Sequence, residues 1–225
     1  EVGMLQLGGH AITLSSDNLQ MSRGETISDT AKALSRYVDV IMARVYDHDI
    51  LDELSQYASV PVINGLSNMY HPCQILADLM TIKEHKKNLK KIKIAWVGDG
   101  NNVCNSLILG CSKLKIKISV ATPDGFEPNN VAVSTAKLHT DIEITNDPIK
   151  AVEDADVVMT DTFVSIHNTD KDRLVKFLPK FQVNTDLMEK ANKNAIFLHC
   201  LPAKRDQEVT SDVIDGKQSV VWDEA

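Results

Sequence analysis

Apolar residues along the chain follow two alternating patterns. Short continuous apolar runs are typical of strands buried on both faces, and segments with an apolar residue every three or four positions are typical of amphipathic helices. The runs predict strands at 38–43, 60–64, 92–97, 116–121, 142–145, 156–161, 195–200 and 219–222. The periodic segments predict helices at 28–37, 50–58, 73–85, 103–114, 130–139 and 148–153. Residues 1–14 are typical of the end of a helix, a glycine turn and a short strand.

This alternation predicts an α/β fold. Strands that alternate with helices form parallel sheets covered by helices, and we expect two doubly wound parallel-sheet domains with an active-site cleft between them. The polar connector at 89–93 is the best candidate for a boundary, which gives domains at 1–88 and 89–225. Ligands of such sheets bind at the carboxyl ends of the strands, so polar residues at these ends are the candidates for a site.

Composition narrows the classes of function. A formal net charge of −7 makes nucleic acid an unsuitable main partner. No apolar run approaches the length of a membrane span, and no signal peptide is recognisable. The cysteines form no C-x-x-C pair, which argues against a zinc site or a disulfide framework and favours reduced, intracellular thiols. We therefore expect an ordinary globular protein without a membrane segment.

One stretch places chemistry at the start of a helix. His71-Pro72-Cys73-Gln74 precedes the apolar pattern of 73–85, and Pro72 suits a first helical turn because its missing N–H would have no partner there. His71 and Gln74 then lie at the positive N-terminal end, which favours anions and developing oxyanions. A capped core helix explains the same four residues equally well.

A glycine-containing turn, Gly98-Asp99-Gly100-Asn101-Asn102, connects a predicted strand to a predicted helix. The dinucleotide fingerprint requires another glycine or alanine three residues after the second glycine, where this chain has Val103. A tight turn is the simpler interpretation, and nicotinamide binding is the weaker one. Asn102 can cap the helix or hold a polar group of a substrate.

Two further candidates follow predicted strands. Asp161, with Ser165 shortly after it, can bind an ammonium group or cap a loop. Cys200, in His199-Cys200-Leu201-Pro202, can act as a nucleophile or pack as a small buried hydrophobe. Taken singly, these residues leave both interpretations open.

Taken together, the motifs resemble those of ornithine carbamoyltransferases in order and spacing. The shared features are His71-Pro72-Cys73-Gln74, the turn at 98–102, the segment 161–165 and His199-Cys200-Leu201-Pro202. Gln20, Arg44 after its strand and Asn64-Gly65-Leu66 match as well, so the resemblance spans essentially the whole chain. The His-Pro-x-Gln motif is shared with aspartate carbamoyltransferases, whereas His-Cys-Leu-Pro and the Asp161 segment are similar to the ornithine branch.

The resemblance implies transfer of a carbamoyl group from carbamoyl phosphate to L-ornithine, giving citrulline and phosphate, as a step of arginine metabolism. Arg44, His71 and Gln74 would hold carbamoyl phosphate, and Arg44 and His71 would polarise its carbonyl oxygen. Asn102, Asp161 and Ser165 would hold the α-amino and carboxylate ends of ornithine, while Cys200 and Leu201 line the junction of the two substrates. Gln20, Pro72, Cys73 and Ile166 complete the implied substrate-binding set, and Arg44, His71 and Cys200 are its catalytic members.

The same resemblance implies no metal and no organic cofactor. It implies a homotrimer or an assembly of trimers, in which Gln20 and its loop reach into the active site of a neighbouring subunit. A cytoplasmic location is expected, or the mitochondrial matrix where a transit peptide has been removed.

Three departures from the family pattern modify these expectations. The Ser-Thr-Arg-Thr segment that binds phosphate in the family is absent, and so are the Glu-Asn-Arg segment and final helix that should follow Ala225. Without the first segment, affinity for phosphate should be severely weakened. Ser165-Ile166-His167 stands where ornithine enzymes usually have Ser-Met-Gly. Putrescine or N-acetylornithine as the acceptor, and a non-catalytic remnant, are therefore the alternatives.

Overall fold

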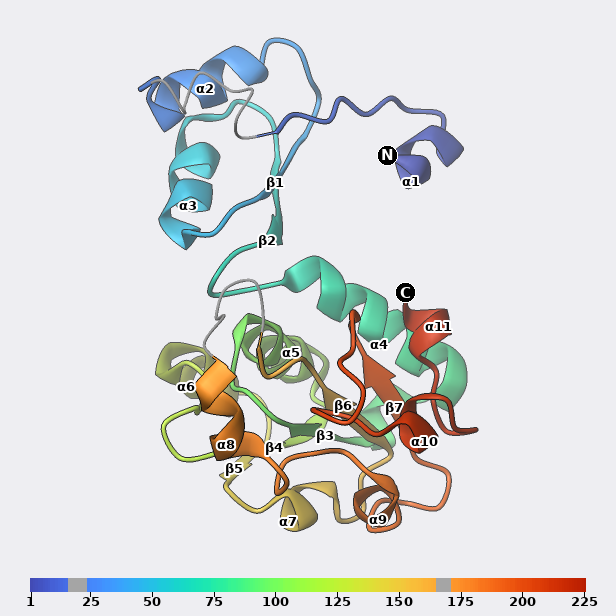
Figure 1. Ribbon diagram of the computed structural model, residues 1–225. Coiled ribbons are helices and arrows are strands. Elements are labelled where there is room, and N and C mark those ends of the chain that lie inside the picture. The colour runs from blue at the N-terminus through green and yellow to red at the C-terminus, as the bar shows by residue number, and fades with distance from the viewer. Residues whose placement is uncertain (16–23, 165–170) are drawn as a thin grey trace. The chain divides into compact units, whose positions relative to one another are not determined.

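The computed structural model describes residues 1–15, 24–164 and 171–225 (Figure 1). The chain divides into two compact units, Glu1–Ile63 and Asn64–Ala225. Gln20, Ser165 and Ile166 from the predicted site lie outside the described residues.

The first unit contains short helices and the start of a small sheet. Its elements are α1 (Val2–Gln6), α2 (Ile27–Leu34), β1 (Ile41–Arg44) and α3 (His48–Tyr57), and β1 pairs with β2 (Val62–Leu66), which begins at the end of this unit. Thr26 accepts a hydrogen bond from the Asp29 N–H at 3.1 Å and so caps α2, which begins one residue before the predicted start at 28. The strand predicted within residues 10–14 is also wrong, because these residues have no neighbouring strand in the described part of the chain.

The second unit is built on a parallel sheet with the strand order β5-β4-β3-β6-β7. The register places Trp96 opposite Val120 on one side and Met159 on the other. The five strands of this described sheet are β3 (Lys93–Val97), β4 (Lys117–Ala121), β5 (Ile142–Thr145), β6 (Val157–Thr160) and β7 (Ile196–His199).

Alternate side chains of β3 enter two separate cores, as the pleat of a strand requires. Ile94 and Trp96 pack with helices α4, α5 and α6, whereas Ala95 and Val97 pack with α7, α8, α9 and α10. Figure 1 shows α4 and α5 on one side of the sheet and α7 and α9 on the other. The continuous apolar runs of the sequence therefore reflect strands buried on both faces.

The helices of this unit are α4 (Pro72–Lys86), α5 (Asn102–Leu114), α6 (Asn130–Lys137), α7 (Pro148–Val152), α8 (Leu174–Phe177), α9 (Thr185–Met188), α10 (Ser211–Ile214) and α11 (Val221–Glu224). Short 3₁₀ turns occur at η3 (Leu89–Lys91) and η4 (Lys171–Arg173). None of the helices in the described ranges combines the length and apolar character that a membrane span needs.

The strand order has a topological switch point at the centre of the sheet, between β3 and β6. β3 continues through α5 to β4 on one side, and its neighbour β6 continues toward β7 on the other side. In doubly wound sheets, ligands bind outside the carboxyl ends of the strands at such a switch point. The turn at 98–102 and Asp161 follow β3 and β6 directly, so both lie at this position.

Helix α4 belongs to the second compact unit although it precedes the connector at 89–93. Ile75, Leu79 and Ile82 are buried in the core with α5, and Gly110 of α5 lies directly against Ile75 and Leu79. The compact units therefore divide before α4, whereas the sequence places the boundary after it.

The strand predicted at 219–222 is wrong. Ser219 forms one isolated parallel bridge with Phe197, and the chain then turns into α11. The acidic residues Asp223 and Glu224 in the first turn of α11 favour a helix start, and Asp223 contacts His85 of α4 at 2.9 Å. Helix α11 thus rests on α4 rather than extending the sheet.

Candidate active site

The His-Pro-x-Gln motif begins α4 as the sequence predicts. His71 occupies the N-cap position, and Pro72 is the first residue of a 15-residue helix. The His71 N–H donates to Ser106 Oγ of α5 at 2.7 Å. This bond holds the start of α4 against α5, at an end where free backbone N–H groups favour anionic ligands.

The side chain of Gln74 is held by two carboxyl groups that the sequence analysis did not identify. Its Nε2 donates to Asp78 Oδ1 at 2.8 Å and lies 3.5 Å from Glu224 Oε1. Glu224 Oε2 accepts the His199 N–H at 2.9 Å, so this carboxyl group connects α4 with the end of β7. The contact with Asp78 could have been predicted from the sequence, because Asp78 lies one helical turn after Gln74. Glu224 is 150 positions away, so no local pattern indicates it.

Burial raises the pKa of Asp78 and of Glu224 above their ordinary values. The negative charge of Asp78 raises the pKa of Glu224 further, because two buried carboxylates in contact cannot both ionise easily. The pair is therefore most stable with one shared proton, carried by Glu224.

We expect Glu224→Gln to flatten the pH dependence of stability. The pKa of Glu224 is raised from 4.5 to about 9, so within this window the native state holds a proton that the unfolded state releases. Glu224 consequently makes the free energy of unfolding fall as pH rises, by about 1.4 kcal/mol per pH unit at most. The amide introduced by this substitution would keep an acceptor for His199 and a donor for Asp78 without titrating. Urea unfolding across this window measures the slope, and equal slopes for both proteins would contradict the shared proton.

The turn after β3 is shaped by close packing. Gly98 has a φ of 139°, in the left-handed region, and a Cβ on Gly100 would lie 2.3 Å from the Pro128 backbone nitrogen. Both glycines are thus required by the turn itself, which supports the tight-turn interpretation over a nicotinamide site.

Asn101 caps α5, so of the two interpretations of Asn102 the helix cap is excluded. Asn101 Oδ1 accepts from the backbone N–H groups of Val103 at 3.0 Å and Cys104 at 3.1 Å, as an N-cap side chain does. Asn102 is the first residue of the helix, and its Nδ2 donates to the Ser67 carbonyl at 2.7 Å. The orientation of this amide makes Asn102 Oδ1 the atom that can accept from a ligand.

An ion pair between Arg173 and Asp99 holds the same turn against the rest of the domain. Arg173 donates to Asp99 Oδ2 at 2.6 Å, and its guanidinium lies 4.9 Å from the Phe126 ring centroid and 5.3 Å from that of Phe177. Burial raises the pKa of Asp99 to about 6, although the nearby guanidinium lowers it. The two partners lie 74 positions apart, so sequence reasoning missed Arg173.

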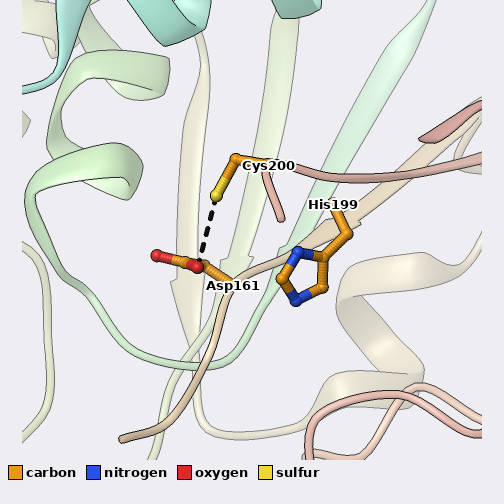
Figure 2. A group of neighbouring side chains, drawn as sticks. All are labelled: Asp161, His199 and Cys200. Carbon is orange, nitrogen blue, oxygen red and sulfur yellow. Dashed lines mark hydrogen bonds between the residues drawn. The ribbon is translucent and has the colours of Figure 1, made fainter. Parts of the chain in front are cut away.

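Asp161 and Cys200 meet where β6 and β7 end (Figure 2). Cys200 Sγ donates to Asp161 Oδ1 at 3.2 Å, and the same carboxylate accepts from Thr162 N–H and from Asn101 Nδ2, each at 2.7 Å. Burial and the charge of Asp161 raise the pKa of the Cys200 thiol well above its usual range. The geometry therefore favours a protonated thiol that fixes Asp161 over a thiolate nucleophile.

His199 completes a group that could be mistaken for a metal site. In the described ranges, ligand atoms of Asp161, His199 and Cys200 lie within 4.8 Å of one another. His199 Nδ1 accepts the Leu201 N–H at 2.9 Å, and its Nε2 is 3.2 Å from Glu208 Oε1, to which it donates. Because both ring nitrogens and the thiol are already engaged in hydrogen bonds, we assign no metal to this group.

The structure brings only part of the predicted set together. Asp161 touches Cys200, which precedes Leu201, and Gln74 reaches the same turn through Glu224 and the His199 N–H. Cys73 is exposed and donates from Sγ to the Asn64 carbonyl at 3.3 Å. Arg44 ends β1 in the other compact unit, so its approach to carbamoyl phosphate stays a prediction.

Two family models match the chain in succession. The carbamoyl-P binding domain of aspartate/ornithine carbamoyltransferase matches residues 1–84, and the Asp/Orn binding domain of the same enzymes matches residues 90–225. The chain belongs to the aspartate/ornithine carbamoyltransferase family. The resemblance found in the motifs is thereby confirmed.

Within this family, the chain is similar to proteins named ornithine carbamoyltransferase. It is 61% identical over 223 residues to that of Cenarchaeum symbiosum, a match covering 99% of this chain and 74% of the relative. It is 52% identical over 231 residues to that of Pyrococcus horikoshii, covering 100% of this chain and 73% of the relative. The solved ornithine carbamoyltransferase of Pyrococcus furiosus superposes with a TM-score of 0.94 at 52% identity, over 100% of this chain and 74% of that one. The predicted α/β class is confirmed.

Proposed function

We propose that this protein transfers the carbamoyl group of carbamoyl phosphate to the δ-amine of L-ornithine. The observation that carries the proposal is the match of both substrate-binding domains, together with high identity to ornithine carbamoyltransferases. In the reaction, the neutral δ-nitrogen bonds to the carbonyl carbon and the bond from that carbon to the phosphate oxygen breaks. Citrulline and phosphate result, and the proton lost by the amine balances the charge on the departing phosphate.

The start of α4 supports a role in binding carbamoyl phosphate. A helix N-terminus offers N–H groups to an anion, and His71 and Gln74 lie within its first turn. In our proposal, His71 and Arg44 donate to the carbonyl oxygen as negative charge develops on it, which is commonly a large part of catalysis. Gln74 binds the carbamoyl amino group.

The residues after β3 and β6 support a role in binding ornithine. Asp161 supplies a buried carboxylate and Asn102 a carbonyl oxygen, and both are acceptors suited to an α-ammonium group. Ser165 and Leu201 complete the ornithine site in this proposal. Holding the δ-amine beside the carbonyl carbon then supplies the orientation that a reaction of two substrates otherwise lacks.

Assembly and location stay predictions of the resemblance. Three large hydrophobic side chains of the first unit are exposed: Tyr37, Met42 and Tyr46. Exposed side chains of this kind suit a subunit interface, which supports the homotrimer. Light scattering on the purified protein tests the trimer. A cytoplasmic location likewise remains a prediction.

The deciding experiment measures citrulline formation from carbamoyl phosphate and ornithine. The assay compares the 225-residue chain with an extended chain, in which the corresponding terminal segments of a relative are added at both ends. We expect citrulline from the extended chain and a much higher KM for carbamoyl phosphate in the shorter one, since the phosphate-binding Ser-Thr-Arg-Thr segment is added only in the former. Putrescine and N-acetylornithine serve as competing acceptors. Faster turnover of either, or no turnover at all, would overturn ornithine as the acceptor.

A further inference from the structure

Asp78 is a buried carboxylate that the proposed reaction does not use directly. It lies on α4 one turn after Gln74, and its side chain is inaccessible to solvent. Oδ1 accepts the Gln74 Nε2–H at 2.8 Å, a hydrogen bond strengthened by the charge of the acceptor. A buried charge on the core side of a helix is costly unless it has partners, so its partners indicate what it does.

The second oxygen of Asp78 shows how the pair is protonated. Among the described residues, no N–H group donates to the buried Oδ2 atom. The Glu224 carboxyl group lies beside Asp78, because Gln74 Nε2 reaches both groups, and its Oε2 already accepts the His199 N–H. A proton on the Glu224 carboxyl group satisfies the contact between the two acids. Asp78 is thereby left as the acceptor for Gln74.

This arrangement determines the orientation of the Gln74 amide. Two carboxyl groups lie on its nitrogen side, Asp78 at 2.8 Å and Glu224 at 3.5 Å, so a rotated amide would place its oxygen against these acceptors. The Gln74 amide is planar, and fixing Nε2 therefore directs Oε1 away from Asp78. An amide oxygen is the group that can accept an N–H from a carbamoyl group.

We propose that Asp78 is a positioning residue for carbamoyl transfer, which holds Gln74 so that its amide oxygen accepts the amino group of carbamoyl phosphate. The proposal rests on the proposed function of this site. Glu224 has a supporting role, because it joins Asp78 to the backbone at the end of β7 and so couples the orientation of Gln74 to the turn that carries Cys200.

The test is a set of variants assayed with both substrates in the extended chain. Asp78→Leu removes the acceptor, and we expect the KM for carbamoyl phosphate to rise about tenfold while the KM for ornithine changes little. Asp78→Asn retains an acceptor for Gln74 and a donor for Glu224, so it should restore most of the lost affinity. If Asp78→Leu does not fold, as judged by circular dichroism, Asp78→Ala replaces it.

The decisive comparison is the double variant Gln74→Ala/Asp78→Leu. If Asp78 acts through Gln74, the second substitution adds nothing to the KM effect of Gln74→Ala alone. Additive effects, an equal rise in both KM values, or an Asp78→Asn variant as impaired as Asp78→Leu would overturn the proposal.

Failure of the proposed function gives a different result. An extended wild-type chain that makes no citrulline contradicts the function whatever the variants do. In that case, the same variants are compared by calorimetric titration with carbamoyl phosphate alone. Positioning by Asp78 still predicts weaker binding in Asp78→Leu and near-normal binding in Asp78→Asn, and equal binding by all variants would overturn it.

Discussion

We expect His71→Ala to lower kcat for citrulline formation by about a hundredfold to a thousandfold. His71 is placed at the start of α4 by the bond from its backbone N–H to Ser106, so its imidazole lies at the positive end of the helix. In the proposed mechanism it donates to the carbonyl oxygen while charge develops there. A donor that acts mainly in the transition state affects kcat more than KM.

His85→Ala is the matched control for this prediction. His85 lies near the other end of the same helix, where its ring contacts Asp223 at 2.9 Å on the surface. Loss of such an exposed pair costs little stability and should leave kcat almost unchanged. Steady-state kinetics with both substrates separate the two variants. Normal turnover by His71→Ala would remove His71 from the mechanism.

The parts of this fold that the sequence predicts best are those with a local cause. The helix predicted at 73–85 is observed as Pro72–Lys86, because its apolar period and the proline at its start are both local signals. The strand predicted at 92–97 is observed as Lys93–Val97, because a strand buried on both faces is continuously apolar. The apolar run at 219–222 is too short to distinguish a strand from a helix, and a helix begins within it.

The polar contacts of the site depend on residues far apart in the chain. Glu224 meets Gln74 across 150 positions, and Asn101 meets Asp161 across 60 positions. No periodicity connects such residues, and only the strand order brings them together. Asp78 is different, because its position one turn after Gln74 is a local signal, but a polar residue on a helix is usually solvated and so was not assigned a contact. The motifs predicted the candidate residues for the reaction, whereas the structure shows that the carboxyl groups of Asp78 and Glu224 hold one of them, Gln74.

The second large effect concerns the amine substrate. We expect Asp161→Asn to lower kcat/KM for ornithine about a hundredfold, because the proposed partner of the α-ammonium group, a buried carboxylate, is replaced by a neutral amide. Asp161 is already fixed by Asn101, Thr162 and Cys200, so little of its orientation has to be established when the substrate binds. The KM for carbamoyl phosphate should remain within about threefold of the wild-type value.

A substrate without the α-amino group distinguishes binding from folding. 5-Aminopentanoate keeps the reacting amine and the carboxylate of ornithine but offers nothing for Asp161 to bind. We therefore expect wild type and Asp161→Asn to carbamoylate it at similar, low rates, whereas they differ strongly with ornithine. The amide introduced at Asp161 also faces the Asn101 Nδ2 donor, which can disturb the turn. Such a disturbance would lower the rates with both amines by the same factor, and that result would assign Asp161 a structural role in place of ammonium recognition.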